Sequence, residues 1–168
     1  ALAAGRDIAA VQRGGGQELG RRAGTEPLPA IVSFGAAATQ AQGDDMDTIA
    51  GLRDGLQQAM LAAVPGARVM GAAAPRLANT LAIAHPRLEA ETLVMAFDLE
   101  GIALSAGSAC SSGKVGPSHV LEAMGEGALA RNTIRISLGA GTTGADTARC
   151  AEVWQALDVR LGVGRNAA

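Results

Sequence analysis

The stretch LSAGSACSSGKVGPSH, residues 104–119, sets one cysteine, Cys110, among side chains too small to build a hydrophobic core. Gly107 and Gly113 flank the cysteine, and several serines make its surroundings polar. Glycine and serine at this density are typical of a loop rather than of the interior of a helix or strand. We therefore expect a mobile loop that presents a thiol, held by a scaffold that the rest of the chain supplies.

Three roles for Cys110 follow from its neighbours. A single cysteine is most often a small buried side chain of the core, although polar flanks are unusual for that role. A zinc site needs more ligands than one thiol and one imidazole, and His119 is the only histidine nearby. A reactive thiol needs positive charge that lowers its pKa, and Lys114 lies close in sequence. The residues alone leave the core role and the reactive role open.

Helix-like and strand-like segments surround this loop. Apolar periodicity and the positions of glycine and proline delimit them. We predict helices over residues 30–42, 44–64, 88–101, 117–125 and 142–161, and strands over 67–71, 77–85, 102–107 and 132–139. Short strands mixed with helices favour an α/β fold of the α+β kind, with layers around one core.

The spacing of apolar residues predicts which sides of these segments face the core. Along 132–139, Ile134 and Ile136 point one way and Arg135 the other, because side chains alternate along a strand. The aspartates at 44, 45 and 47 suit the N-terminal end of a helix. The other expected core faces are Ile49, Leu52, Leu56, Met60 and Ala63; Leu77, Leu81 and Ile83; Leu88, Thr92, Met95, Ala96 and Leu99; and Val153, Leu157 and Leu161.

Composition and charge exclude several classes of protein. The chain has 168 residues, 48% of them hydrophobic, which suffices for one domain with a core, and its net charge of −2 argues against a nucleic-acid surface. No apolar run approaches the roughly 20 residues of a membrane helix. Two cysteines far apart in sequence do not suggest a disulfide framework, so we expect a reducing, cytoplasmic compartment. The first residue is Ala1, and we expect a processed protein or a piece of a longer one.

Four segments together resemble a known family. SAGSACSSG around Cys110 resembles the active-site loop of group I cysteine desulfurases, which are pyridoxal 5'-phosphate (PLP) enzymes of the class V aminotransferase family. In order and spacing, GGGQELGRRAGT (14–25), PRLANTLAI (75–83) and RNTIRISLG (131–139) resemble further segments of that family. The resemblance implies the C-terminal portion of a fold-type I PLP transferase. Residues 1–28 would be the tail of its large PLP-binding domain, and 29–168 its small domain, with a short, mostly antiparallel sheet covered by helices and the mobile loop 104–119.

The resemblance also implies roles for residues that meet the substrate. Cys110 matches the nucleophile that takes sulfur from L-cysteine and holds it as a persulfide, which explains why its loop has to move. Arg135 matches the arginine that grips the substrate's α-carboxylate, a task suited to the guanidinium fork. Asn79 matches a substrate-binding asparagine. The plainer explanation for Arg135 is an ordinary surface arginine on a strand, which is more common than a substrate-binding one.

On the cofactor side, Thr25 matches the residue that contacts the PLP phosphate from across a dimer, and Gly24 and Arg22 belong to the same cofactor-binding segment. An ordinary helix N-cap is the plainer explanation for Thr25. Lys114 is the only lysine in the chain, and it does not match the family's Schiff-base position. We therefore expect the PLP lysine to lie outside these residues and the segment alone to be inactive.

The function implied by the resemblance is conversion of L-cysteine to L-alanine, with sulfur passed to an acceptor or scaffold protein for iron–sulfur cluster or thio-cofactor assembly. A homodimer is expected for the full enzyme, without nucleic acid, membrane or metal. Cys150 is expected to be structural, and His85 and His119 to have no catalytic part. The alternatives are an inactive fragment, a sulfur-carrier or dimerisation module without PLP chemistry, and a related class V aminotransferase or selenocysteine lyase.

Overall fold

The computed structural model describes residues 9–106 and 118–162, so Cys110 and Lys114 lie outside the described residues. Seven helices are described: η1 (Gln17–Gly20), α1 (Leu28–Ala41), α2 (Met46–Ala63), α3 (Ala90–Leu99), α4 (His119–Ala123), η2 (Gly127–Leu129) and α5 (Gly144–Gly162). Four strands are described: β1 (Arg68–Val69), β2 (Thr80–Ala84), β3 (Ser105–Ala106) and β4 (Thr133–Ser137). Each predicted helix and strand is therefore present, with shorter bounds in most cases.

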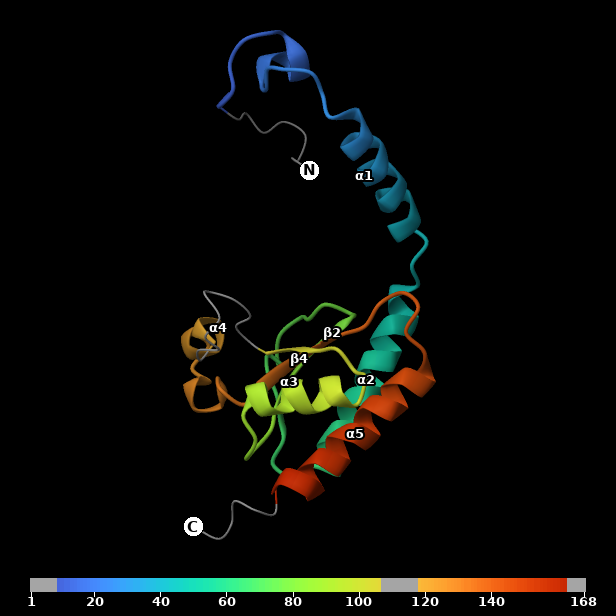
Figure 1. Cartoon of the computed structure of the whole chain (residues 1–168), viewed down its shortest axis with the longest axis vertical. Coiled ribbons are helices and arrows are strands. Elements are labelled where there is room, and N and C mark those ends of the chain that lie inside the picture. Colours follow the sequence, from blue (N-terminus) through green and yellow to red (C-terminus); the bar gives the residue numbers. More distant parts are fainter. Residues whose placement is uncertain (1–8, 107–117, 163–168) are drawn as a thin grey trace. The chain divides into compact units, whose positions relative to one another are not determined.

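The chain divides into two compact units, Ala1–Asp44 and Asp45–Ala168. The first unit contains η1 and α1, and α1 carries no buried residue. The second unit contains the sheet and the remaining helices (Figure 1). The division predicted at residue 28 concerns the domains of a whole family member, and it stays a prediction.

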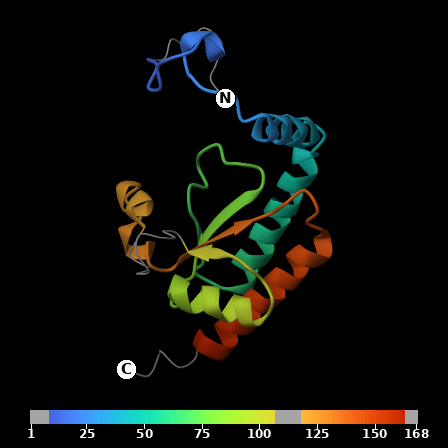
Figure 2. The same ribbon diagram turned by 45° about the horizontal axis from the view of Figure 1, so that its top comes forward.

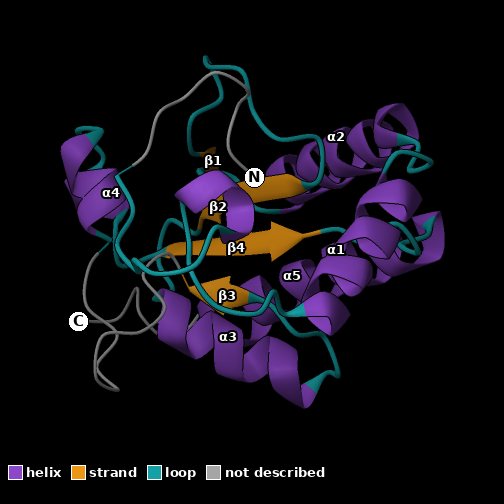
Figure 3. Ribbon diagram, turned by 90° about the horizontal axis from the view of Figure 1, so that it is seen from above, coloured by secondary structure: helices purple, strands orange, loops and turns teal. Residues whose placement is uncertain are grey.

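The sheet of the second unit has the strand order β1-β2-β4-β3, and all neighbouring strands are antiparallel. Figure 3 shows the four strands in this order, with the two longest, β2 and β4, in the centre. β2 and β4 pair over their full length, from Thr80 opposite Ser137 to Ala84 opposite Thr133. The predicted short antiparallel sheet with helices around it is confirmed.

One face of the sheet carries the hydrophobic core. Its two central strands contribute two directly opposed pairs, Leu81 with Ile136 and Ile83 with Ile134. Figures 1 and 2 show α2, α3 and α5 on this side of the sheet. These helices contribute buried residues to the same cluster: Ile49, Leu56 and Met60 from α2, Leu93, Ala96 and Phe97 from α3, and Cys150, Val153, Trp154 and Leu157 from α5.

Among the described residues of the second unit, the opposite face of the sheet is covered at one end. There Ala84 packs with Met70, Leu121 and Ala130 in a second, smaller buried cluster, to which α4 contributes Leu121. Beside this cluster the same face presents Arg135. One sheet thus has a packed face that stabilises the fold and a second face that the described residues of this unit leave partly open.

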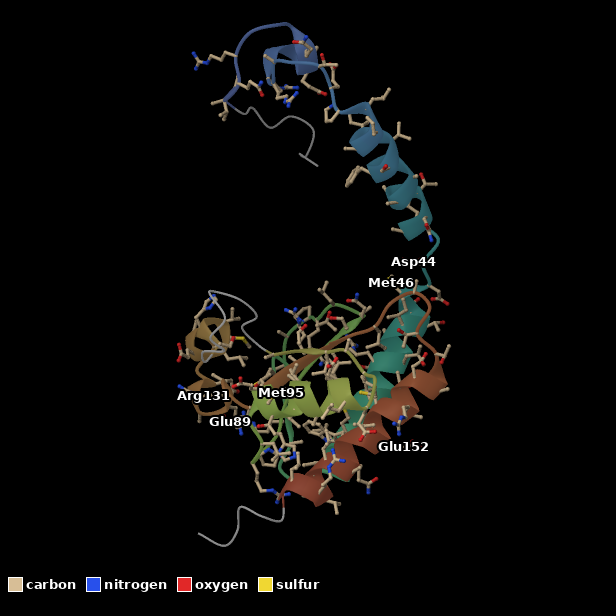
Figure 4. All side chains as sticks on the ribbon, viewed as in Figure 1. Asp44, Met46, Glu89, Met95, Arg131 and Glu152 are labelled. Carbon is tan, nitrogen blue, oxygen red and sulfur yellow. The ribbon has the colours of Figure 1, made fainter. Side chains whose placement is uncertain are left out.

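Most residues predicted to face the core are buried, but three, Met95, Leu99 and Leu77, are exposed. In α2 the expected residues Ile49, Leu56 and Met60 are buried, and Asp45 caps the helix by accepting hydrogen bonds from two backbone N–H groups. In the face expected for α3, Leu88 and Ala96 are buried as predicted, but Met95 and Leu99 are wrong, because they are 57% and 87% exposed. Figure 4 labels Met95 on this helix. Besides Ala96, the buried residues of α3 are Ala90, Leu93 and Phe97. Leu77, expected on the core side of β2, lies before that strand and is exposed.

Candidate functional site

Arg135 lies in the middle of β4, on the partly open face of the sheet. In the register of the strands it stands between Ala82 of β2 and Ser105 of β3. Its neighbours along the strand, Ile134 and Ile136, point into the core, and this alternation turns the guanidinium outward. The sequence therefore places an exposed cation on a rigid central strand next to small side chains.

A hollow of about 250 Å³ adjoins this arginine. Its walls are mostly apolar and come from β1's end, β2, β4 and α4. The lining residues are Met70, Ala82, Ser118, Val120, Leu121, Met124, Thr133 and Arg135. A mainly apolar hollow with one guanidinium at its wall suits a small ligand that carries a carboxylate.

Both ends of the segment that carries Cys110 are anchored close to this hollow. Before the segment, Ala106 of β3 pairs with Ile134, one residue from Arg135. After it, Ser118 is buried and lines the hollow itself, and its Oγ accepts a hydrogen bond from the Leu121 N–H at 3.4 Å, which caps α4. The catalytic assignment of Cys110 falls on residues outside the described part of the chain.

Asn79 immediately precedes β2. Its backbone oxygen accepts a hydrogen bond from the Leu138 N–H at 2.8 Å, and its Oδ1 accepts one from the Thr80 hydroxyl at 3.0 Å. The bond to Leu138 fastens the start of β2 to the end of β4. Asn79 does not line the hollow beside Arg135.

The three predicted cofactor residues lie together in the first unit. Arg22 donates from Nη1 to the backbone oxygen of Thr25 at 3.3 Å, and the Gly24 N–H donates to Oε1 of Gln17 at 3.3 Å. Gly24 has a φ of +95°, which favours glycine, and Ala23 beside it is buried. The side chains of Arg22 and Thr25 are exposed on this tight loop.

Cys150 has the features of a structural thiol. It is buried in the core cluster on α5, and burial raises the pKa of its thiol to about 11. The group is therefore protonated at neutral pH and is a poor nucleophile. The expectation that Cys150 is a core residue is confirmed.

The described residues show neither a metal site nor a membrane-spanning helix. Across residues 9–106 and 118–162, no group of three or more His, Cys, Asp or Glu side chains is placed to hold a metal ion. The helices described here are also too short or too polar to cross a membrane.

Two polar residues of the hollow were missed from the sequence. Ser118 and Thr133 are each 1% exposed, and the Thr133 hydroxyl donates to the Leu129 oxygen at 2.8 Å. Ser118 could have been found as an N-cap, since serine directly precedes the first residues of α4. Thr133 carries no comparable signal, because a threonine at a strand end is equally common on an exposed face.

Comparison with known proteins identifies the family. The family described as "Aminotransferase class-V" matches residues 7–149. A cysteine desulfurase from Cereibacter sphaeroides is 47% identical over 142 residues, which cover 84% of this chain and 37% of the relative. A cysteine desulfurase from Gluconacetobacter diazotrophicus is 41% identical over 153 residues, which cover 89% of this chain and 38% of the relative.

Solved structures agree with the sequence comparison. A NifS-like protein from Rickettsia africae superposes with a TM-score of 0.74 at 32% identity, covering 90% of this chain and 40% of that one. A second NifS-like protein gives a TM-score of 0.77 at 27% identity, covering 95% and 41%. The chain therefore spans about two fifths of the length of the proteins it matches.

Proposed function

Because this chain belongs to the class-V aminotransferase family, we propose that it is part of a cysteine desulfurase. The reaction takes sulfur from L-cysteine, leaves L-alanine and holds the sulfur on Cys110 as a persulfide. One observation in the fold carries this proposal: Ser118, which follows the segment that contains Cys110, lines the Arg135 hollow, and Ala106, which precedes that segment, pairs with Ile134 next to Arg135. The names of the relatives, cysteine desulfurases at 47% and 41% identity, support it.

In this proposal Arg135 binds the substrate's α-carboxylate. Its planar fork can donate two parallel hydrogen bonds, and such charge-assisted pairs are roughly twice as strong as neutral ones. The strand holds the guanidinium in place, so the carboxylate fixes the orientation of the substrate. The small and apolar walls beside it, Ala82 and Met70, leave room for a small amino acid.

Cys110 accepts the sulfur atom. It lies four residues beyond Ala106, and four extended residues span at most about 14 Å, so the end of β3 limits the reach of the thiol. The sulfur–carbon bond of L-cysteine breaks, a sulfur–sulfur bond forms on Cys110, and the thiol proton is matched by the proton gained at the substrate carbon. The products are L-alanine and the Cys110 persulfide, so no external oxidant or reductant is needed.

The first unit fits the phosphate group of PLP. The exposed Thr25 hydroxyl and the Arg22 guanidinium are the donors that a phosphate prefers, and the glycine turn at Gly24 keeps bulk away from them. When bound, PLP acts as an electron sink that labilises the bonds of the amino acid. The proposal also includes a Schiff-base lysine for PLP, a homodimer, a sulfur acceptor and a cytoplasmic location.

The test uses the full natural polypeptide that carries these residues, incubated with PLP and L-cysteine. Alanine release and a mass increase of one sulfur atom on the Cys110 peptide are expected. Cys110→Ser should abolish both. Cys150→Ala is the matched control: it removes the other thiol of this chain and should leave both intact.

Other outcomes separate the alternatives. PLP bound without a persulfide on Cys110 would indicate another class V aminotransferase or a selenocysteine lyase. No PLP binding by the full polypeptide would indicate an inactive fragment or a sulfur-carrier module. Either result would overturn the desulfurase proposal.

A further inference from the structure

Arg76 is a second arginine at the partly open face, and it has no role in the proposed reaction. It lies in the β1–β2 connection, and its side chain is 19% exposed. Its Nη1 atom is buried without a hydrogen-bond partner within the described part of the chain. A buried nitrogen of a charged guanidinium that lacks an acceptor is costly, so such an atom calls for an explanation.

The nearest carboxylate does not supply that acceptor. Nη2 of Arg76 is 4.0 Å from Oδ1 of Asp54, which is beyond hydrogen-bond distance. The same Oδ1 is already contacted by Arg53, through Nε at 2.9 Å and Nη2 at 2.8 Å. Two guanidinium groups therefore share one carboxylate, and these three described side chains together carry a net charge of +1.

Arg53 fixes the loop on which Arg76 stands. Its Nη1 donates to the backbone oxygen of Leu77 at 2.6 Å, and Arg53 itself is buried in α2. Because residue 77 adjoins residue 76, this bond holds the backbone that carries the second guanidinium. The backbone beside Arg76 is thus fixed, with Nη2 of Arg76 at 4.0 Å from Oδ1 of Asp54.

A hollow of about 190 Å³ lies beside Arg76. Its other walls are Met70, Leu77, Thr80 and Ala82. Met70 and Ala82 also line the Arg135 hollow, so the two hollows adjoin, but Arg135 is not part of this one. The Thr80 hydroxyl donates to Asn79 Oδ1, which leaves Arg76 as the main donor for a ligand.

We propose that the Arg76 hollow is a carboxylate-binding site, separate from the Arg135 hollow, in which the guanidinium of Arg76 pairs with a carboxylate that the described residues do not supply. A carboxylate matches the planar fork and the single excess charge, and the apolar walls suit a short aliphatic stem. The carboxylate comes either from a dissolved small molecule or from an aspartate or glutamate of further polypeptide. The proposal does not depend on the desulfurase reaction.

The experiment uses the full natural polypeptide with arginine side chains and aspartate and glutamate carboxyls labelled for NMR. Acetate is the probe, and its saturable effect on the Arg76 Nε–H signal is measured. Arg76→Gln removes the donor, and Arg76→Lys keeps the charge but loses the fork. Arg131→Gln is the matched control, because it removes one positive charge from an exposed side chain (labelled in Figure 4).

If the carboxylate comes from a dissolved molecule, acetate binding should be saturable. It should weaken at least tenfold in Arg76→Gln, weaken less in Arg76→Lys and be unchanged in Arg131→Gln. A carboxylate of the polypeptide predicts no acetate response. It also predicts one carboxyl other than Asp54 whose pKa is low in the native protein and returns to its usual value only in Arg76→Gln. If neither signal is found, or if Asp54 is the only carboxyl that changes, the proposal is wrong.

Discussion

His85 offers the sharpest test of how this fold is held together. It directly follows β2, is fully buried, and its Nδ1 accepts hydrogen bonds from the backbone N–H groups of Arg87 at 3.1 Å and Leu88 at 2.9 Å. Nδ1 must therefore be unprotonated, which leaves the proton of the neutral ring on Nε2. Nε2 lies 3.0 Å from Oδ1 of Asp158, close enough for electrostatic attraction between its N–H and the carboxylate.

The magnitude follows from these contacts. Each backbone N–H that loses a buried acceptor lowers the free energy of unfolding by about 1–3 kcal/mol. Replacing a large core side chain by a small one lowers it by about 2 kcal/mol more. The ring also meets Trp154 edge-on, with centroids 4.9 Å apart. We expect His85→Ala to lower the free energy of unfolding by about 4 kcal/mol, and His85→Phe, which keeps the ring but loses the acceptor, by about 2 kcal/mol.

The pH dependence has a definite sign. Burial, chiefly, and the Arg87 charge hold the pKa of His85 below its usual value of 6.5, and the Asp158 carboxylate opposes them. Below pH 6.5 the unfolded chain takes up a proton that the folded chain refuses. The stabilisation by His85 is therefore complete above pH 6.5 and is lost as the pH falls toward the folded-state pKa, by at most about 1.4 kcal/mol per pH unit.

Urea unfolding between pH 5 and 8 measures both effects, and the single tryptophan of the chain, Trp154, supplies the fluorescence signal next to the histidine. His119→Gln is the matched control, because it removes the other histidine of the chain from an exposed position on α4. The control should keep the pH slope, and His85→Phe should lose it. A His85→Phe protein with the native slope between pH 5 and 6.5, or with native stability at pH 7.5, would refute the reasoning.

Three further predictions concern the core, the second thiol and the open face. Ile134→Ala should lower the free energy of unfolding by about 3–4 kcal/mol in urea, because the side chain is fully buried at the centre of the sheet; a loss below 1 kcal/mol would contradict this. In a Cys110→Ser background at pH 8, Cys150 should not react with a colourimetric disulfide reagent until urea is added, because burial raises its pKa to about 11; rapid labelling of the native chain would contradict this. In the full natural polypeptide, Arg135→Lys should raise the KM for L-cysteine about tenfold or more, since lysine cannot make the bidentate pair, and an unchanged KM would exclude carboxylate binding by this residue.

The alternation of side chains along strands allowed much of the sheet to be predicted from the sequence. In β4 it correctly placed Ile134 and Ile136 in the core and Arg135 outside, because a period of two leaves no other assignment. Helical periodicity predicted the core face of α3 less well, because the apolar Met95 and Leu99 are exposed. Alanine-rich helices blur the periodicity, because small apolar residues occur on every side.

Residues of the candidate site could be predicted from sequence only where they belong to a recognisable motif. Arg135 was found both by alternation and by family resemblance, and the structure adds the hollow beside it. The positions of Arg22, Gly24 and Thr25 on one tight loop also follow from their spacing. Nothing local predicts that Ser118 lines the hollow of Arg135, since that contact depends on how α4 folds back on the sheet.

Arg76 shows why such tertiary contacts escape sequence analysis. Its role depends on Arg53, 23 positions earlier in α2, which contacts Oδ1 of the neighbouring Asp54 and fixes the backbone at Leu77. An arginine with a free aspartate nearby would form an ordinary surface ion pair of little consequence. Because Arg53 is buried and holds Asp54 first, the second guanidinium is left with an unpaired buried nitrogen. The charge that the proposed carboxylate would balance thus arises from competition between two arginines for one acceptor.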